Sequence, residues 1–397
     1  MATAVLDLDF HHVPPQIEGL DGYQRALILI RLDGKPVSRT YLPVKLGRID
    51  RITLREAVIA AADRNFWNQW LEDYLNPEDP VKIPGYQHSA TIAICSRDRP
   101  EDLKRCLDAL MQLPEDDQEV LVIDSCSATE ETRQVVAAYA GVRYLREDYP
   151  GLNRARNRAL REASHAIVIF TDDDAVPDPG WLRAHLRNYA DPMVMCTTGL
   201  TMPLELETRA QETFEQYNPF ARGFERKVYT RINLNPLTVG RVGAGVNMAF
   251  RREVLATVGP FDEALDAGTP THSGGEAEMF SRILASGYRI VYEPGALSWH
   301  RHRRTWEELR KAIYGYGVGI YAFWTRKYFY DGELTTPLIA LRWFLHDQLP
   351  ALLRSWLRRP NAQPFDLVAA ELMGCVAGPF AYFESRKQLS NRAARGG

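Results

Sequence analysis

The sequence predicts an α/β protein built on a mainly parallel β-sheet, with a small α+β module before it and a helical region after it. Between residues 88 and 302, short apolar runs alternate with amphipathic runs of helical length, as in repeated β-α-β units. Residues 1–85 contain a hairpin pattern and one amphipathic run. Residues 303–397 carry aromatic and aliphatic residues at three- and four-residue steps. We therefore expect three domains with these bounds.

The composition is that of a folded protein with an ordinary hydrophobic core. Of the 397 residues, 45% are hydrophobic and 25% are charged, which excludes a disordered or fibrous chain. A net charge of −3 gives no indication of a nucleic-acid partner. The five cysteines are scattered without a Cys-x-x-Cys pair, which favours a reducing compartment over disulfides or structural zinc.

The N-terminal module is expected to be a hairpin followed by one helix. Strand-like runs over residues 23–32 and 36–44 flank an Asp33-Gly34 turn. A helical pattern then extends over residues 53–75, and prolines in residues 76–85 predict a linker. The module shows no readable chemistry, so binding of an acceptor, binding of a partner and packing on the core all stay open.

The central region predicts a ligand site at the carboxyl edge of its sheet. The expected strands and helices alternate in the order 91–95, helix from Pro100, 120–123, helix 130–139, 142–145, helix 152–163 and 166–170. Polar residues follow three of these strands: Arg97 and its neighbours, Asp124-Ser125, and Asp172-Asp173-Asp174. In parallel sheets this edge is where ligands bind.

The three consecutive aspartates, residues 172–174, give the strongest functional signal. Adjacent carboxylates repel one another, and a divalent cation offsets that repulsion. Mg²⁺ and Mn²⁺ take oxygen ligands from carboxylates and substrate phosphates. Alternate side chains of an extended segment share a face. We therefore assign Asp172 and Asp174 to the metal and nucleotide, and Asp173 to a structural role; a solvated acidic loop is the alternative.

A glycine loop that opens a helix, residues 273–282, supplies a candidate general base. Glu276 shares a helix face with apolar residues, whereas Glu278 points away and is expected to pair with Arg282. We assign Glu276 as the base, whose ionised form the helix N-terminus would favour. The pattern fits equally well a capping box between Ser273 and Glu276.

Two histidines spaced by one residue, His300 and His302, follow a strand-like run over residues 289–292. This spacing at a strand end favours a metal ligand as much as a structural role, and His300 is placed to complete a site begun by Asp174.

The arginines near the predicted helix start, in residues 151–157, are suited to binding a diphosphate and equally suited to facing solvent.

The C-terminal region is basic, with 15 lysines and arginines against 8 acidic residues from Arg301 onward. Arginines among Leu, Trp and Phe over residues 337–357 suggest a peripheral membrane contact and hence a lipid-linked acceptor. The alternative is a helical cap that packs on the catalytic domain. Because we find no signal-peptide pattern and no charge-free apolar span, we expect a cytoplasmic protein that contacts at most the inner face of the plasma membrane.

Six segments, taken together, resemble the family-two glycosyltransferases, in the family's order. They are residues 91–100, 120–127, 151–157, 170–177, 242–251 and 273–282. The resemblance covers about residues 88–302 and implies the Rossmann-like GT-A fold. It also implies inverting transfer of a sugar from a nucleotide-diphosphate donor to a hydroxyl of a glycan, lipid-linked or small-molecule acceptor, with Mn²⁺ or Mg²⁺ as the cofactor.

The resemblance also implies roles for individual residues. Nucleotide contacts fall to Arg97, Asp124, Arg156 and Asp172, and metal ligation to Asp172, Asp174 and His300. Glu276 stands where the family usually has the Asp of a Glu-Asp pair, with Gly275 in place of the Glu. A non-catalytic sugar- or nucleotide-binding protein and a sugar nucleotidyltransferase remain the alternatives; the intact aspartate pair opposes the first, and the lack of a glycine-rich basic loop opposes the second.

Overall fold

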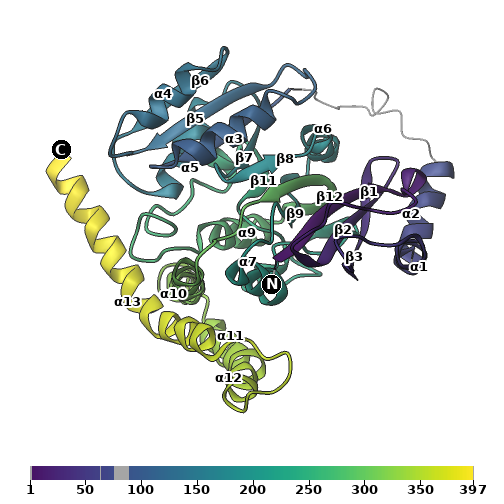
Figure 1. Ribbon diagram of the computed structural model, residues 1–397. Helices are drawn as coiled ribbons and strands as arrows, with labels where there is room; N and C mark the ends of the chain where they lie inside the picture. The colour runs from purple at the N-terminus through teal and green to yellow at the C-terminus, as the bar shows by residue number, and fades with distance from the viewer. Residues whose placement is uncertain (1, 63, 76–88, 397) are drawn as a thin grey trace.

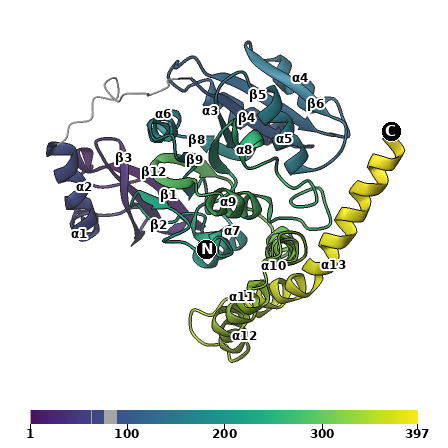
Figure 2. The same cartoon turned by 180° about the vertical axis from the view of Figure 1, so that it is seen from behind.

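The computed structural model of the chain describes residues 2–62, 64–75 and 89–396 (Figure 1). The expected linker over residues 76–85 and the expected first residue of the central domain, His88, lie outside the described residues. The described residues form a large sheet, a smaller sheet with its own helices beside it, and a group of C-terminal helices (Figure 1, Figure 2). This is the predicted α/β organisation with its two additions.

The strands expected first in the central region pair in parallel and are joined by the expected helices. The strands are β4 (Thr91–Ser96), β5 (Glu119–Ser125), β6 (Val142–Glu147) and β7 (Ile167–Thr171). The helices are α3 (Pro100–Leu110), α4 (Glu131–Ala137) and α5 (Leu152–Glu162). Successive side chains of β4 point to opposite faces of the sheet. Ile92 and Ile94 pack in the apolar cluster with α3, and Ala93 packs in the cluster with α5.

Five further strands complete the sheet and make it mixed. They are β8 (Ala175–Pro177), β9 (Val194–Pro203), β10 (Lys227–Tyr229), β11 (Asn247–Arg251) and β12 (Arg289–His300). The strand order is β10-β12-β9-β11-β7-β4-β5-β6, with β8 paired to β12. Because β8 pairs antiparallel with the end of β12, with Ala175 opposite His300, the aspartates just before β8 are brought to His300.

Strand β12 is longer than predicted, since a strand was expected only over residues 289–292. Its pairing with β9 shifts register between Glu293 and Ser298 and then resumes, so the strand passes through Pro294 and Gly295 instead of ending there. His300 is therefore the last residue of a strand, which fixes its backbone. The shorter helices around this half of the sheet are α6 (Trp181–Leu186), α7 (Arg209–Tyr217), α8 (Val254–Thr257) and α9 (Gly275–Ala285).

The N-terminal module contains the predicted hairpin, but a third strand and a second helix were not predicted. Its elements are β1 (Ala2–Asp9), β2 (Tyr23–Leu32), β3 (Lys35–Pro43), α1 (Arg51–Ala61) and α2 (Arg64–Leu75). The single helix expected over residues 53–75 is wrong, because Ala62 leaves the helical conformation with ψ of 67°. The change of direction lets Leu54 of α1 and Phe66 of α2 enter the same buried cluster.

The module is not separate from the rest of the protein. Ile28 and Ile30 of β2 face its own helices, whereas Leu27 and Leu29 are fully buried against the large sheet. Their partners there come from β9, β12 and the segment between β9 and α7: Leu200, Met202, Leu206 and Leu297. The interpretation in which the module packs on the core is therefore confirmed by the contacts, and the small sheet is covered on both faces.

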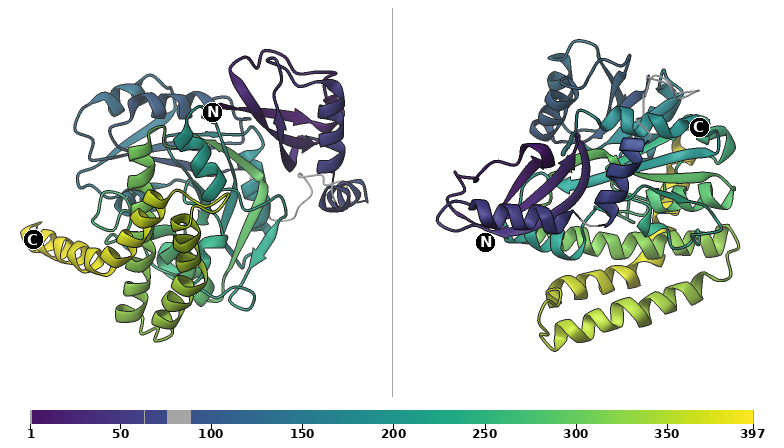
Figure 3. Two further views of the ribbon diagram at one scale, coloured as in Figure 1. Left: turned by 60° about the horizontal axis from the view of Figure 1, so that its bottom comes forward. Right: turned by 90° about the vertical axis from the view of Figure 1, so that its right-hand side faces the viewer.

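The C-terminal region is helical, as predicted. It consists of α10 (Trp306–Tyr330), α11 (Thr336–Trp343), the π-helical turn η5 (Phe344–Gln348), α12 (Leu349–Trp356) and α13 (Phe365–Gly396). Glycines allow α10 and α13 to touch backbone to backbone: a Cβ on Gly374 would lie 2.1 Å from the carbonyl oxygen of Tyr314. The helices after α10 lie on the side of α10 away from the sheet (Figure 1, Figure 3).

One described helix, Phe365–Arg392, is long and apolar enough to cross a membrane by length and composition alone. In the structure 39% of its most apolar window is buried. Core helices of soluble proteins meet the same two criteria, so this helix is weak evidence for insertion into a membrane.

Candidate functional site

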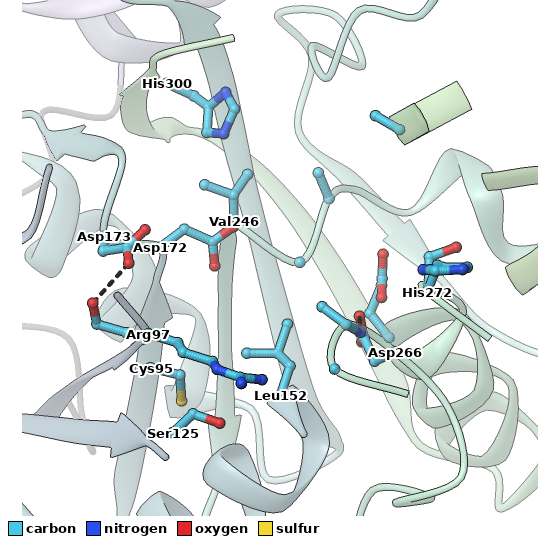
Figure 4. Close-up of a pocket in the computed structure, with 18 of the residues that line it drawn as sticks. Cys95, Arg97, Ser125, Leu152, Asp172, Asp173, Val246, Asp266, His272 and His300 are labelled. Atoms are coloured by element: carbon cyan, nitrogen blue, oxygen red, sulfur yellow. Dashed lines mark hydrogen bonds between the residues drawn. The ribbon is translucent and has the colours of Figure 1, made fainter. Parts of the chain in front are cut away.

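A cavity of about 340 Å³ opens at the carboxyl edge of the large sheet, where the sequence predicts the ligand site. Its sheet side carries Arg97, Ser125, Asp172 and His300, and Asp266 lies across the space from them (Figure 4). The residues that line the cavity are spread along the sequence between Cys95 and Tyr316. Its walls are polar near the aspartates and aromatic near Phe220 and Tyr316.

Asp172, Asp174 and His300 form a group that fits a divalent metal ion. Each offers a ligand atom, and these atoms lie within 4.8 Å of one another. The Oδ1 atom of Asp174 is buried and makes no hydrogen bond within the described part of the chain, although it lies 3.1 Å from Nε2 of His300. An unsatisfied carboxylate oxygen beside an imidazole nitrogen matches the oxygen and nitrogen donors that Mn²⁺ accepts in proteins.

The three aspartates are held in different electrostatic surroundings. Asp173 accepts a hydrogen bond from Ser96 Oγ at 2.7 Å, and its pKa is raised to about 7 by burial and by Asp174. Burial and Asp174 also raise the pKa of Asp172. Burial opposes ionisation of Asp174 as well, but His300 and nearby arginines outweigh it and lower its pKa. Asp173 and Asp174 lie in a turn, not in the expected extended segment, and the same nitrogen of Arg99 contacts both of them.

Two arginines beside the aspartates were missed by the sequence analysis. Arg99 contacts Asp173 at 3.2 Å and Asp174 at 2.9 Å, and Arg303 contacts Asp174 at 3.3 Å. Both lie within three residues of a predicted site residue, Arg97 and His300 respectively. Both arginines would have been found by including every lysine and arginine in the loops that follow these strands.

Glu276 lies on α9 and lines the cavity. A Cβ on Gly245 would lie 3.5 Å from the Glu276 carboxyl carbon and 2.9 Å from a guanidinium nitrogen of Arg156. Glycine at this position therefore lets the loop before β11 pass between the two side chains. Arg156 is buried and bonds Asp266 at 2.7 Å; Asp266, far away in the sequence, gave no local signal.

The capping-box interpretation of Glu276 is wrong. The N-cap of α9 is Gly274, with φ of 101°, and no side chain among the described residues caps this helix. Ser273, the other member of the expected box, instead donates its hydroxyl to the carbonyl oxygen of Gly315 on α10 at 2.9 Å. The carboxylate of Glu276 is therefore not used to terminate the helix.

The expectation that the helix N-terminus keeps Glu276 ionised is also wrong in its net effect. Burial and the neighbouring Asp266 raise the pKa of Glu276 to about 7, against the opposing effects of Arg156 and of the residue's own backbone N–H. Desolvation thus outweighs the helix terminus at this position. Glu278 pairs with Arg282 as expected, at 2.6 Å, and also with Arg326 of α10 at 2.8 Å.

The remaining predicted nucleotide contacts divide into two groups. Arg97 and Arg156 line the cavity. Asp124 is not among its lining residues; its carboxylate accepts hydrogen bonds from Tyr144 at 2.7 Å and Arg146 at 3.2 Å. Its neighbour Ser125 does line the cavity, so Asp124 shapes the loop that reaches it.

A second cavity of about 450 Å³ adjoins the first one and shares Glu276 with it. Phe220, Ala244, Ser273 and Tyr316 also belong to both cavities. The part that belongs to the second cavity alone is largely apolar and reaches the C-terminal helices, with Phe280, Ile320, Trp343 and Glu371 among its lining residues. The glutamate thus stands between a polar space and an apolar one.

Comparisons with known proteins show similarity to glycosyltransferases. Residues 91–259 match the family model described as glycosyl transferase family 2. The chain is 31% identical over 249 residues to the pre-mycofactocin glycosyltransferase of Mycobacterium tuberculosis, covering 59% of this chain and 48% of that protein. It is 28% identical over 235 residues to the glycosyltransferase AglE of Haloferax volcanii, covering 56% and 70%. The chain thus spans about half the length of the first of these relatives.

A solved structure supports the fold. The mannosyltransferase PcManGT from Pyrobaculum calidifontis, solved in complex with GDP-Man and Mn²⁺, aligns with a TM-score of 0.53 and 18% identity. The alignment covers 79% of this chain and 95% of that one. This similarity concerns the arrangement of the backbone. Residues 91–259 therefore form a domain that matches glycosyl transferase family 2, and the chain has the GT-A fold.

Proposed function

We propose that this protein transfers a sugar from a nucleotide-diphosphate donor to an acceptor hydroxyl by a metal-assisted, inverting displacement. The observation that carries the proposal is the position of Glu276, a half-buried carboxyl shared by two cavities, one of which is lined by Asp172 and His300 of the group that they form with Asp174. A Mn²⁺ or Mg²⁺ ion held by that group would neutralise the charge that develops on the leaving diphosphate.

The donor is assigned to the first cavity. Arg97 and Arg156 line it and supply positive charge for the nucleotide diphosphate. Arg99 and Arg303 keep Asp174 ionised, so its carboxylate stays a ligand at neutral pH. The GDP-Man in the complex of the Pyrobaculum mannosyltransferase supports a nucleotide-sugar donor as a class.

Glu276 is the proposed general base. As the acceptor hydroxyl attacks the anomeric carbon from the face opposite the diphosphate, the carboxylate takes the hydroxyl proton. A pKa of about 7 is close to that of an efficient base at neutral pH. One carboxylate and one displacement invert the anomeric centre, unlike the two displacements of retaining glycosidases.

The acceptor is assigned to the second cavity. Its aromatic and aliphatic walls favour an acceptor that carries an apolar group close to the reacting hydroxyl, such as a lipid-linked or aromatic molecule. The outer faces of α11 and α12 expose Leu338, Leu341, Leu353 and Trp356 beside Arg342, Arg354 and Arg358. This combination supports peripheral contact with an anionic membrane on the cytoplasmic side.

Ligand-induced stabilisation tests the proposal. A nucleoside diphosphate with Mn²⁺ is expected to raise the melting temperature of the wild type, because a ligand of the folded state stabilises it by mass action. Asp174→Ala should lose the Mn²⁺-dependent part of the shift and lose transfer, whereas Asp148→Ala, on a side chain 84% exposed, should keep both. An Asp174→Ala protein with wild-type transfer would refute the metal assignment. Pyrophosphate release from a sugar phosphate and a nucleoside triphosphate would instead indicate a nucleotidyltransferase.

A further inference from the structure

A buried chain of polar side chains leads from the proposed metal group to the N-terminal module. His300 Nδ1 lies 3.0 Å from Nδ1 of His302, and His302 Nε2 lies 3.2 Å from a carboxylate oxygen of Glu215 on α7. The other carboxylate oxygen of Glu215 accepts a hydrogen bond from Arg39 of β3. The side chains of Glu215 and His302 are each 2% exposed.

Aromatic rings enclose this chain of contacts. The ring of Phe214 lies 4.6 Å from that of His302, and the ring of Phe220 lies 5.2 Å from that of His300. Each imidazole nitrogen of His302 therefore has one protein partner and little access to water. Hydrogen bonds between these side chains, rather than contacts with solvent, therefore determine which ring nitrogens carry a proton.

The carboxylate determines the tautomer of both imidazoles. Because an ionised carboxylate only accepts hydrogen bonds, Nε2 of His302 must carry the hydrogen. With Arg39 already balancing the charge of Glu215, a neutral His302 then has its lone pair on Nδ1. That lone pair requires a donor, so Nδ1 of His300 must carry the hydrogen, and the lone pair of His300 lies on Nε2 toward Asp174.

We propose that Glu215 and His302 are positioning residues that hold His300 in the Nδ1–H tautomer, with its Nε2 free to bind a divalent cation, and that Arg39 of the N-terminal module orients Glu215. This inference rests on the proposed metal-dependent function. It also gives the module a role for which its own sequence shows no signal. Partners of this kind behind a metal-binding histidine fix its ring and its tautomer.

The unsatisfied oxygen of Asp174 agrees with this assignment. In the Nδ1–H tautomer, Nε2 of His300 and Oδ1 of Asp174 are both acceptors, and they face each other at 3.1 Å. Oδ1 of Asp174 makes no hydrogen bond among the described residues, so this oxygen is available to a cation. A cation bound between the two atoms would satisfy both.

Substitutions at His302 separate positioning from packing. His302→Phe keeps a ring beside Phe214 but removes the acceptor for His300. His302→Asn restores an acceptor, because the amide oxygen of Asn lies near the place of Nδ1. We expect Mn²⁺ affinity to fall about 10- to 100-fold in His302→Phe and to recover substantially in His302→Asn. Mn²⁺ binding is measured by electron paramagnetic resonance of the free ion, with melting temperatures recorded for each variant.

The N-terminal module has its own pair of variants. Arg39→Met should weaken Mn²⁺ binding, whereas Arg31→Met, which removes a different ion pair between the module and the large domain, at Asp178, should leave Mn²⁺ binding unchanged. Equal losses of affinity in the two variants would show that only docking of the module matters, and would overturn the role of Arg39.

The tautomer is read directly from the metal-free protein by ¹⁵N imidazole chemical shifts of labelled histidines. A protonated Nδ1 and an unprotonated Nε2 at His300 in the wild type, lost in His302→Phe, are the expected result. A protonated Nε2 at His300 in the wild type would overturn the inference, as would unchanged Mn²⁺ affinity in His302→Phe. A wild-type protein with the expected tautomer that binds no Mn²⁺, alone or with a nucleoside diphosphate, would instead refute the metal-dependent function.

Discussion

Glu276 is the residue on which the proposed chemistry depends. It is half-buried, it borders both cavities, and Arg156 and Asp266 act on it with opposite charges. Burial makes its ionised form costly, and a costly ionised form is a stronger base. The position that allows it to meet donor and acceptor together therefore also adjusts its proton affinity.

Glu276→Gln should lower the transfer rate about 10²- to 10⁴-fold, because the amide cannot accept the acceptor's proton. Binding of the nucleoside diphosphate should be unchanged, since Gln occupies the same space. The rate is measured as release of nucleoside diphosphate in the presence of acceptor. Glu278→Gln, two residues along the same helix, is the control: it should weaken the pairs with Arg282 and Arg326, lowering stability while transfer continues. A Glu276→Gln protein with near-normal turnover would remove this residue from the mechanism.

The pH dependence follows from the same group. Glu276 must be ionised to act as a base, and its pKa is raised to about 7, so kcat/KM should rise with pH through about 7 and then level off. Asp173 also has a pKa raised to about 7, so the profile is compared between the wild type and Asp173→Asn. A rise retained in Asp173→Asn identifies Glu276; a flat profile between about pH 6 and 8 contradicts the assignment.

At the residue scale, the sequence predicts those site residues whose role is indicated by their immediate neighbours in the chain. Asp172 and Asp174 were found because consecutive carboxylates at a strand end indicate a cation, although the segment is a turn and not the extended run that was expected. Asp266 and Glu215 were not found, since each meets its partners, Arg156 and His302, across about ninety residues or more of chain. The raised pKa of Glu276 could not be predicted either, because burial depends on what packs over the helix start.

Among the elements, most of the predicted strands of the large sheet have unbroken apolar runs. Strand β9 is buried at every position, yet it contains buried threonines, Thr197, Thr198 and Thr201, so its pattern lacks a long apolar run. Strand β12 was predicted too short because Pro294-Gly295 interrupts it. The helix over residues 53–75 was predicted as one piece, since an apolar stripe continues across the bend that tertiary packing imposes.

The contact between α10 and α13 gives a prediction at this scale. Gly374→Ala would place a Cβ 2.1 Å from the carbonyl oxygen of Tyr314, a distance that forces the backbones apart. Unfolding free energy should fall by about 1–3 kcal/mol or more, measured by denaturant or thermal unfolding. Val376→Ala, on a side chain of the same helix that is 71% exposed, is the control and should stay within about 0.5 kcal/mol of the wild type. A fully stable Gly374→Ala protein would show that the two helices are not tightly joined.

For the whole molecule, the exposed apolar side of α11 and α12 predicts reversible membrane binding. Wild-type protein should co-sediment with vesicles that contain anionic lipid, and less so as salt screens the arginines. The double variant Leu341→Asp/Trp356→Asp should remain in the supernatant. Ile232→Asp changes an equally apolar side chain, 91% exposed outside this surface, and should bind like the wild type. Wild-type protein that stays in the supernatant at low salt would contradict the peripheral contact.

The arrangement of the three parts was harder to predict than their existence. The basic tail and the hairpin were visible in the sequence, but nothing local indicated that Leu27 and Leu29 would face Leu200 and Leu297. Alternating apolar residues show that a sheet has two buried faces and do not show what covers each face.

The shared apolar layer between the small and large sheets has a practical consequence for anyone who prepares this protein. A shortened clone that starts at Ser89 would leave Leu200, Met202 and Leu297 uncovered, and such clones typically collect in inclusion bodies. Supplying residues 1–75 as a separate polypeptide should restore yield if the two pieces reassemble.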